Sequence, residues 1–311
     1  EKEDLNNKVK IVGIKKECYI FNEDTLLYEK NTIDDANKVT CDILSEKLEN
    51  VVIPYVNNKL QKLRENDGNP HQILDTEEIL KKLNKMKTRF KNQSLRKNII
   101  SALKCDFRLR DNDFLLKLTK YKNLLSVNDK VIDLKTGDMR ERQSSDYQVN
   151  TIKMDFDGYN PDLGPTEWSK FVFDILGDNQ EMYNYVHTVL GYFITKETKE
   201  SIALFLTGFG SNGKTLLTNC ISKVLGTKNC PKVPSLIFDA NQKSNVNSAS
   251  PQEAELFNAC IGNINETNED LRLDSKFKDM VDSGSVEKAR HLHGDLFEYE
   301  KTAKFLFTTN N

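Results

Sequence analysis

A glycine-rich segment between an apolar run and a helical pattern constrains this chain more than any other feature. Residues 201–207 read SIALFLT, residues 208–215 read GFGSNGKT, and residues 216–221 continue as LLTNCI. The middle segment fits the pattern G-x-x-x-x-G-K-[ST], which is typical of loops that bind phosphate groups between a strand and a helix. A chance glycine-rich turn would need neither neighbour, so the flanking strand and helix patterns favour a phosphate-binding loop.

The residue types in this loop suit the binding of a nucleoside triphosphate. Glycines let the backbone wrap tightly and aim its N–H groups at an anion, and the helix that follows adds the positive end of its dipole. We expect Lys214 to contact the β- and γ-phosphates and the Thr215 hydroxyl to bind Mg²⁺. The predicted cofactors are therefore ATP and Mg²⁺. The predicted ATP-binding residues are Gly208, Gly210, Ser211, Asn212, Gly213, Lys214 and Thr215.

An acidic residue and an amide are predicted to complete the site. Residues 256–264 have the apolar pattern of a buried strand, and Glu266 lies at its end. We expect Glu266 to act as the general base or as a Mg²⁺ ligand; the alternative is an ordinary solvated acidic turn. A last apolar strand ends at Asn310, whose amide can orient the attacking water or donate to the γ-phosphate. The order strand, loop, helix, strand, acid predicts an α/β P-loop NTPase core.

Basic side chains gather around a predicted β-hairpin near the end of the chain. Residues 291–299 place a Gly-Asp turn between two short segments that contain apolar residues, which is a hairpin pattern. Such groups on a protruding hairpin suit the phosphates of a single DNA strand, and an ordinary surface hairpin is the alternative. The predicted DNA-binding residues are Lys288, Arg290, His291 and His293.

The N-terminal third of the chain carries no pattern of catalytic residues. Short apolar runs within residues 9–21 predict a small sheet or hairpin, and apolar residues recur at helical spacing over 42–64, where Pro54 is expected to kink or split the helix. An acidic capping pair predicts a new helix at Asp75. Residues 81–97 form the most basic stretch, which is either a solvated helix face or a contact with the DNA backbone.

Three regions are predicted along the 311 residues. Residues 1–120 are expected to form a mixed α+β region, residues 121–198 a mainly helical domain, and residues 199–311 the ATPase core. The segment 159–165, rich in Pro and Gly, is the best candidate for a connector. Because the chain begins with Glu1 and ends at the polar end of a strand, we expect it to be a piece of a longer polypeptide.

Composition excludes several classes of protein. Charged residues are 30% and hydrophobic residues 38%, as in soluble globular proteins, and with a net charge of −2 any nucleic-acid binding must rest on local patches. No apolar run approaches a membrane span and no secretory signal opens the chain, so we expect a cytoplasmic location in a bacterial host or at a viral replication site. The six cysteines form no C-x-x-C pair, which argues against a zinc site and favours reduced core residues.

Four stretches together resemble the superfamily 3 helicases, in particular the poxvirus-type and phage- or plasmid-type primase–helicases. GFGSNGKT at 208–215 is similar to their Walker A loop, and NETNED at 265–270 to their Walker B region. FKDMVDSGSVEKAR at 277–290 is similar to the segment that leads into their DNA-binding hairpin, and FLFTTN at 305–310 to their motif C. Further upstream, residues 128–137, 159–161 and 190–192 resemble the helical domain that precedes the ATPase.

The resemblance implies an ATP-dependent DNA helicase with an AAA+-like core that moves 3′ to 5′ and acts on single-stranded and forked DNA. It also implies a ring hexamer, a sensor role for Asn310, and a primase domain as a further part of the same polypeptide. Two departures stand out: Asn265 precedes Glu266 where many members have paired acids, and residues 283–285 read SGS where Gly-Asp is usual. The arginine finger normally follows motif C and would lie beyond Asn311.

Two other classes of function stay open. One is a replication-initiation scaffold or origin-binding module that binds ATP without unwinding DNA. The other is a small-molecule P-loop kinase, which needs arginines that clamp the phosphates after the core. Only Arg272 and Arg290 follow the loop, and this argues against a kinase. DNA-stimulated ATP hydrolysis with strand displacement would distinguish the helicase from the scaffold.

Overall fold

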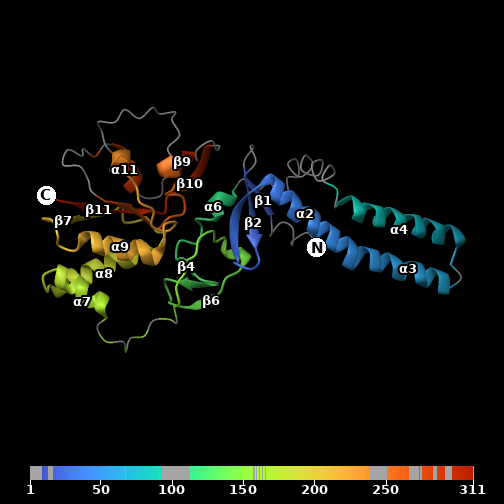
Figure 1. Cartoon of the computed structure of the whole chain (residues 1–311), viewed down its shortest axis with the longest axis horizontal. Coiled ribbons are helices and arrows are strands. Elements are labelled where there is room, and N and C mark those ends of the chain that lie inside the picture. Colours follow the sequence, from blue (N-terminus) through green and yellow to red (C-terminus); the bar gives the residue numbers. More distant parts are fainter. Residues whose placement is uncertain are drawn as a thin grey trace. The chain divides into compact units, whose positions relative to one another are not determined.

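The computed structural model divides the chain into two units, residues 1–22 with 28–112 and residues 23–27 with 113–311 (Figure 1). Side chains are not described at 9–17, 33, 37, 251, 276, 286–290 and 296–297. The residues that the structure describes are 9–12, 17–66, 68–90, 92, 113–156, 158, 160, 162, 164, 166–238, 251–265, 273, 275–282, 286–290 and 296–310. Among these residues, no helix is long and apolar enough to cross a membrane.

The first unit opens with a three-stranded sheet, which confirms the predicted small sheet. Its strands are β1 (Val9–Val12), β2 (Glu17–Asn22) and β3 (Leu27–Thr32), in the order β1-β2-β3, with β1 and β2 antiparallel. Helix α2 (Ile33–Lys47) begins directly after β3 because Thr32 caps it. The Thr32 hydroxyl accepts the Asp35 N–H while the Asp35 carboxylate accepts the Thr32 N–H, so two backbone donors are satisfied at the start of the helix.

The α-helix predicted over 42–64 is interrupted just before Pro54. A π-helical turn (Leu48–Val52) lies between α2 and α3 (Ile53–Glu65), and the backbone stays right-handed helical at both junctions. The Ile53 N–H donates to the Leu48 carbonyl, so the turn widens just before Pro54, which has no N–H to donate. At the other end of α3, the Gly68 N–H donates to the Leu63 carbonyl at 2.8 Å. This bond closes α3, and the chain then turns back along it as α4 (Pro70–Phe90) (Figure 1).

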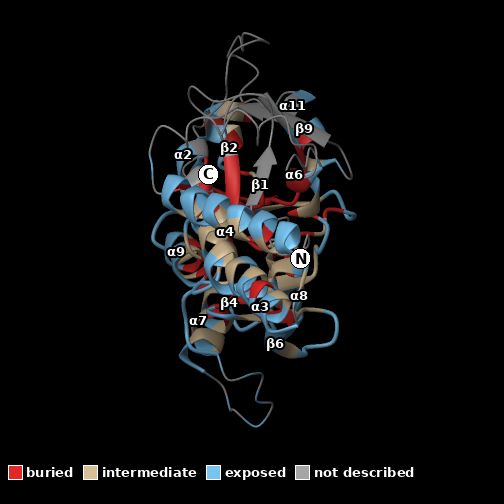
Figure 2. Ribbon diagram, turned by 90° about the vertical axis from the view of Figure 1, so that its right-hand side faces the viewer, coloured by how far each residue is buried: buried red, intermediate tan, exposed pale blue. Residues whose placement is uncertain are grey.

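Helix α4 begins earlier than predicted, so the capping role expected for Asp75 is wrong. The Asn69 side chain accepts the His71 N–H at 2.9 Å, and Pro70 occupies the first helical position. This Asn-Pro start outweighs the acidic pair, which lies inside the helix. Much of α4 is exposed (Figure 2). The part of the basic stretch that follows Phe90 lies outside the described residues.

The second unit begins with the short helix α6 (Phe114–Lys117) and an antiparallel sheet. The sheet consists of β4 (Leu124–Val127), β5 (Lys130–Asp133) and β6 (Met139–Glu141), followed by a 3₁₀ turn (Ser144–Asp146). Two helices then follow, α7 (Glu167–Ile175) and α8 (Gln180–Ile194). Within 121–198, strands therefore fill the first part and helices the second.

Helix α8 begins with an asparagine cap. The Asn179 side chain accepts the Met182 N–H at 3.0 Å, so Asn179 is the N-cap. Asp178 lies in the turn between the two helices, with φ 55°. Gly177 precedes it with φ 68°, and the Asp178 N–H donates to the Phe173 carbonyl at 3.2 Å. This hydrogen bond and the left-handed backbone at Gly177 end α7 before α8 begins.

A parallel sheet forms the centre of the C-terminal part. Its strands are β7 (Ala203–Thr207), β8 (Ile261–Ile264) and β11 (Lys304–Thr309), in the order β7-β11-β8, and β8 is shorter than the predicted 256–264. The helix after β7 is α9 (Lys214–Leu225). Shorter elements are a 3₁₀ turn (Ser235–Phe238), α10 (Pro251–Ala254) and α11 (Ser275–Val281). Strands β9 (Val286–Arg290) and β10 (Leu296–Glu300) pair antiparallel, so the first strand of the hairpin lies before the predicted range 291–299, and the predicted Gly-Asp turn lies outside the described residues.

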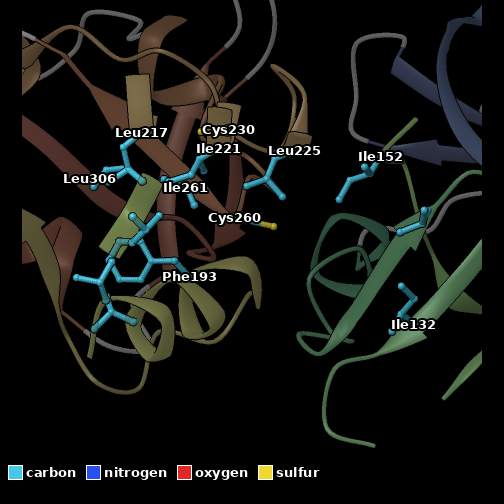
Figure 3. Close-up of a cluster of buried hydrophobic side chains, with 14 residues drawn as sticks. Ile132, Ile152, Phe193, Leu217, Ile221, Leu225, Cys230, Cys260, Ile261 and Leu306 are labelled. Carbon is cyan, nitrogen blue, oxygen red and sulfur yellow. The ribbon is translucent and has the colours of Figure 1, made fainter. Parts of the chain in front are cut away.

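The core of the second unit joins these layers. Phe193 of α8, Leu217, Ile221 and Leu225 of α9, and Ile261 and Leu306 of the parallel sheet belong to one buried cluster (Figure 3). The apolar face of α9 thus packs on the sheet, which fixes where the loop between β7 and α9 lies. Helices together with a parallel sheet confirm the predicted α/β class.

Candidate functional site

The loop between β7 and α9 contains several residues with left-handed backbone angles. Positive φ angles occur at Gly208 (151°), Ser211 (63°) and Gly213 (83°). Gly213 is the N-cap of α9. Because glycine has no side chain, the cap residue accepts no hydrogen bond from the first N–H groups of the helix. A helix start of this kind is suited to an anion because N–H groups and the helix dipole act together.

Lys214 lies over the loop that precedes it. Its ammonium group donates to the Gly208 carbonyl at 2.6 Å and to Oδ1 of Asn212 at 2.8 Å. A positive charge is therefore held inside the curl of the loop, next to the start of α9. The three predicted residues Gly208, Asn212 and Lys214 come together, while Thr215 follows on the first turn of α9 and is exposed.

Both ends of the loop require glycine. A Cβ added at Gly208 would lie 2.3 Å from Nδ2 of Asn212, inside the curl itself. A Cβ added at Gly213 would lie 2.7 Å from Cγ2 of Ile175, because α7 packs against this end of the loop. The positive φ angles add to the strain of any side chain at these positions.

The carboxyl ends of the parallel strands meet beside the loop. Thr207 pairs with Thr309, and Ile264 pairs with Phe307, so Asn265 and Asn310 follow strands that end at the same edge. Oδ1 of Asn265 accepts long hydrogen bonds from the hydroxyl of Thr218 on α9 (3.5 Å) and that of Thr308 on β11 (3.4 Å). The Asn265 amide therefore links helix and sheet at the position that directly precedes Glu266.

Several predicted site residues stay predictions. Glu266, His291 and His293 lie outside the described residues. Lys288 and Arg290 lie on β9, for which only the backbone is described. Asn310 is exposed just after β11.

Two lysines, Lys196 and Lys304, are buried, which no sequence pattern predicted. The Lys304 ammonium group donates to the carbonyls of Thr195 and Thr302, and it lies 5.3 Å from the centre of the Tyr192 ring. Burial lowers the pKa of Lys304 to about 8, and it also lowers the pKa of Lys196. Lys304 is the first residue of β11, at the end of the strand that lies away from the loop, and these lysines are not part of the candidate site.

Comparison with protein families places much of the chain in a known group. The family described as D5 N terminal like matches residues 5–177, which is more than half of the 311 residues. The chain belongs to the D5 N-terminal-like family. The matched region of this D5 N-terminal-like chain includes β4 to β6 and α7, and it ends before the loop at 208–215.

Viral relatives match over a longer stretch. An African swine fever virus protein named "Putative primase C962R" is 25% identical over 244 residues, which are 75% of this chain and 24% of the viral protein. The same protein from a second isolate is 24% identical over 242 residues, with the same coverage. The chain spans about a quarter of the length of the curated relatives it matches.

Solved structures give weaker matches. The A form apo structure of the NrS-1 C terminal region is 14% identical with a TM-score of 0.36, covering 63% of this chain and 56% of that chain. A second apo structure of the same region is 15% identical with a TM-score of 0.32, covering 65% and 58%.

Proposed function

We propose that this chain is the ATP-binding and ATP-hydrolysing part of a DNA helicase within a viral or mobile-element replication protein. The observation that carries the proposal is the loop between β7 and α9, where the Lys214 ammonium group lies over Gly208 and Asn212 at a helix start with no side-chain cap from Gly213. Family membership and a viral relative whose name describes a primase support a role in DNA replication.

The donors of the loop fit ATP with Mg²⁺. The loop N–H groups and Lys214 would hold the β- and γ-phosphates, and Thr215 with Glu266 would hold Mg²⁺, which neutralises charge on the phosphates when bound. Glu266 would accept a proton from the attacking water. The Asn310 amide would orient that water or donate to the γ-phosphate, and the shared edge of β8 and β11 supports this pairing of roles.

The remaining features of the proposal come from the resemblance to superfamily 3 helicases. Movement 3′ to 5′, a ring hexamer and an arginine supplied by a neighbouring subunit belong to this part. The β9–β10 hairpin supports it, because the predicted contacts Lys288, Arg290, His291 and His293 lie on or directly after β9. Single-stranded and forked DNA are the proposed substrates.

The test is ATP hydrolysis and forked-DNA unwinding by the longer polypeptide that contains this chain. Lys214→Ala removes the charge inside the loop and should abolish both activities. Lys223→Ala is the matched control, since Lys223 is exposed in the last turn of the same helix. If Lys214→Ala hydrolyses ATP and unwinds DNA as the wild type does, the helicase mechanism is wrong.

One observation favours a second candidate, an ATP-binding scaffold or origin-binding module that does not unwind DNA. Asn265 stands where many superfamily 3 helicases have a second acid, and its Oδ1 lies 3.4 Å from the Thr308 hydroxyl and 3.5 Å from the Thr218 hydroxyl. ATP binding without turnover in the longer polypeptide would support this scaffold. Primer synthesis that survives Lys214→Ala would assign the primase chemistry to another part of the polypeptide.

A further inference from the structure

One face of α3 forms a groove that belongs to none of the sites described above. The groove has a volume of about 500 Å³ and is lined by Tyr55, Asn58, Lys59, Lys62, Leu63 and Asn66. These positions recur every three or four residues and therefore share one face of the helix. From Tyr55 to Asn66 the face extends about 17 Å at 1.5 Å per residue.

The groove combines an exposed aromatic ring with two exposed lysines. Tyr55 is 70% exposed, although burial of such a ring would be favourable. Lys59 and Lys62 are exposed as well, and within the part of the chain that the structure describes neither forms an ion pair. Both ammonium groups are therefore accessible to an external ligand.

The lysines of α4 behave differently, although they belong to the most basic stretch of the sequence. Lys82 pairs with Glu78 at 2.8 Å, and Lys87 pairs with Glu49 at 2.5 Å. Carboxylates thus neutralise part of that helix. Among the described residues that line the groove on α3 none is a carboxylate, and they offer cations, amides and an aromatic ring.

This set of groups determines the chemistry of the partner. Ammonium and amide groups suit phosphate oxygens, and an exposed aromatic ring suits a base that is free to stack, as in a single strand. An apolar peptide fits less well, because Tyr55 and Leu63 are the only large apolar groups in the lining and both lysines would lose water. We propose that this face of α3 binds single-stranded nucleic acid, with Tyr55 stacking on a base and Lys59 and Lys62 contacting phosphates.

The surface goes beyond the proposed helicase site. All its lining residues belong to the first unit, and none lies in the loop at 208–215. Binding at α3 therefore needs no ATP and should persist in Lys214→Ala. This separates a failure of the helicase proposal from a failure of this one.

The test is fluorescence anisotropy of the 311-residue chain without nucleotide, with a labelled thymidine oligonucleotide of about 12 nucleotides. Tyr55→Ala should weaken binding between about fivefold and 150-fold, which is the loss of one stacked base. Tyr55→Phe keeps the ring and should bind as the wild type does. Because Tyr55 is exposed, neither variant should change the melting temperature.

Salt dependence tests the two lysines. The double variant Lys59→Glu/Lys62→Glu should bind more weakly, and its plot of log K against log salt should be shallower by about 1.4 for two lost contacts. Lys135→Glu/Lys153→Glu changes the net charge equally at exposed positions outside the groove, and it should bind like the wild type.

Three results would overturn the proposal. The first is wild-type affinity in Tyr55→Ala together with an unchanged salt slope in the Lys59 and Lys62 variant. The second is an equal loss of affinity in Lys135→Glu/Lys153→Glu and in Lys59→Glu/Lys62→Glu, which would show that only the net charge of the chain matters. The third is no binding of thymidine and uridine oligonucleotides by the wild-type chain. Binding of the thymidine oligonucleotide, the uridine oligonucleotide or both, with loss in Tyr55→Ala, supports the proposal and identifies which strand is preferred.

Discussion

Replacing Gly213 by alanine tests whether α7 holds the phosphate-binding loop in place. Gly213 has φ +83°, and a Cβ added there would lie 2.7 Å from Cγ2 of Ile175. The left-handed backbone costs a residue with a side chain about 1–2 kcal/mol, and overpacking costs about 1–3 kcal/mol. We therefore expect Gly213→Ala to lower the free energy of unfolding by about 2–5 kcal/mol.

Gly177→Ala separates the two contributions. Gly177 follows α7 with φ +68°, and a Cβ added there would have no atom within 4 Å. Its replacement should cost only the backbone strain, about 1–2 kcal/mol. Both substitutions also restrict the unfolded chain, which stabilises the protein by about 0.4–1 kcal/mol, and this effect cancels when the two variants are compared.

Urea unfolding of the 311-residue chain, followed by circular dichroism, measures both costs. In an Ile175→Ala background, which removes Cγ2, Gly213→Ala should cost no more than Gly177→Ala does. The coupling between Gly213→Ala and Ile175→Ala should then be about 1–3 kcal/mol. Equal costs of Gly213→Ala and Gly177→Ala in the wild-type background would refute the packing of α7 on the loop.

Two further predictions concern buried cations of the second unit. Arg142 is buried and donates to the carbonyls of Leu26 at 2.9 Å and Asn128 at 2.6 Å. Arg142→Met leaves these carbonyls without their donor and should lower the free energy of unfolding, measured in urea, by about 2–4 kcal/mol. A loss below about 1 kcal/mol would contradict this anchoring role. Lys304 has a pKa of about 8 in the folded chain against 10.5 unfolded, so between these pH values the unfolded chain binds more protons and stability rises with pH. The stability of the wild type relative to Lys304→Met should therefore rise by about 3 kcal/mol from pH 8 to pH 10.5 in urea titrations, whereas a constant difference would show that Lys304 titrates normally.

Local patterns predicted the elements whose shape is determined by neighbouring residues. The GFGSNGKT segment fixes a loop and a helix start through its glycines and Lys214, and the structure has this loop between β7 and α9. The Gly-Asp turn likewise predicted the β9–β10 hairpin. Two nearby patterns fit a helix start, the pair Asn69-Pro70 and the acidic pair at Asp75. The predicted start at Asp75 is wrong, because Asn69 caps α4 and Pro70 is its first residue.

Properties that depend on tertiary packing could not be predicted in this way. Lysines are almost always exposed, so nothing in the sequence around Lys304 indicates that β11 lies between two other strands and buries this side chain. Phe205 lies in the apolar run that predicted a strand, and its 42% exposure follows from the position of β7 as an outer strand of the described sheet. From the sequence, Asn265 is notable only because an asparagine stands where many superfamily 3 helicases have an acid. Its contacts with Thr218 and Thr308 could not be predicted, since these residues are distant in sequence.

The strand order also dictates how the protein can fold as it is synthesised. Strand β11 lies between β7 and β8, and Phe305 pairs with Ala203 across about a hundred residues of intervening chain. Helix α9 and its loop can form early from local contacts, whereas β7 and β8 have no shared partner until β11 has left the ribosome. Closing so long a segment is entropically costly and slow. The edge at which the strands before Asn265 and Asn310 end is thus assembled only after β11 has been synthesised, and until then the apolar strands stay exposed to aggregation or to chaperones.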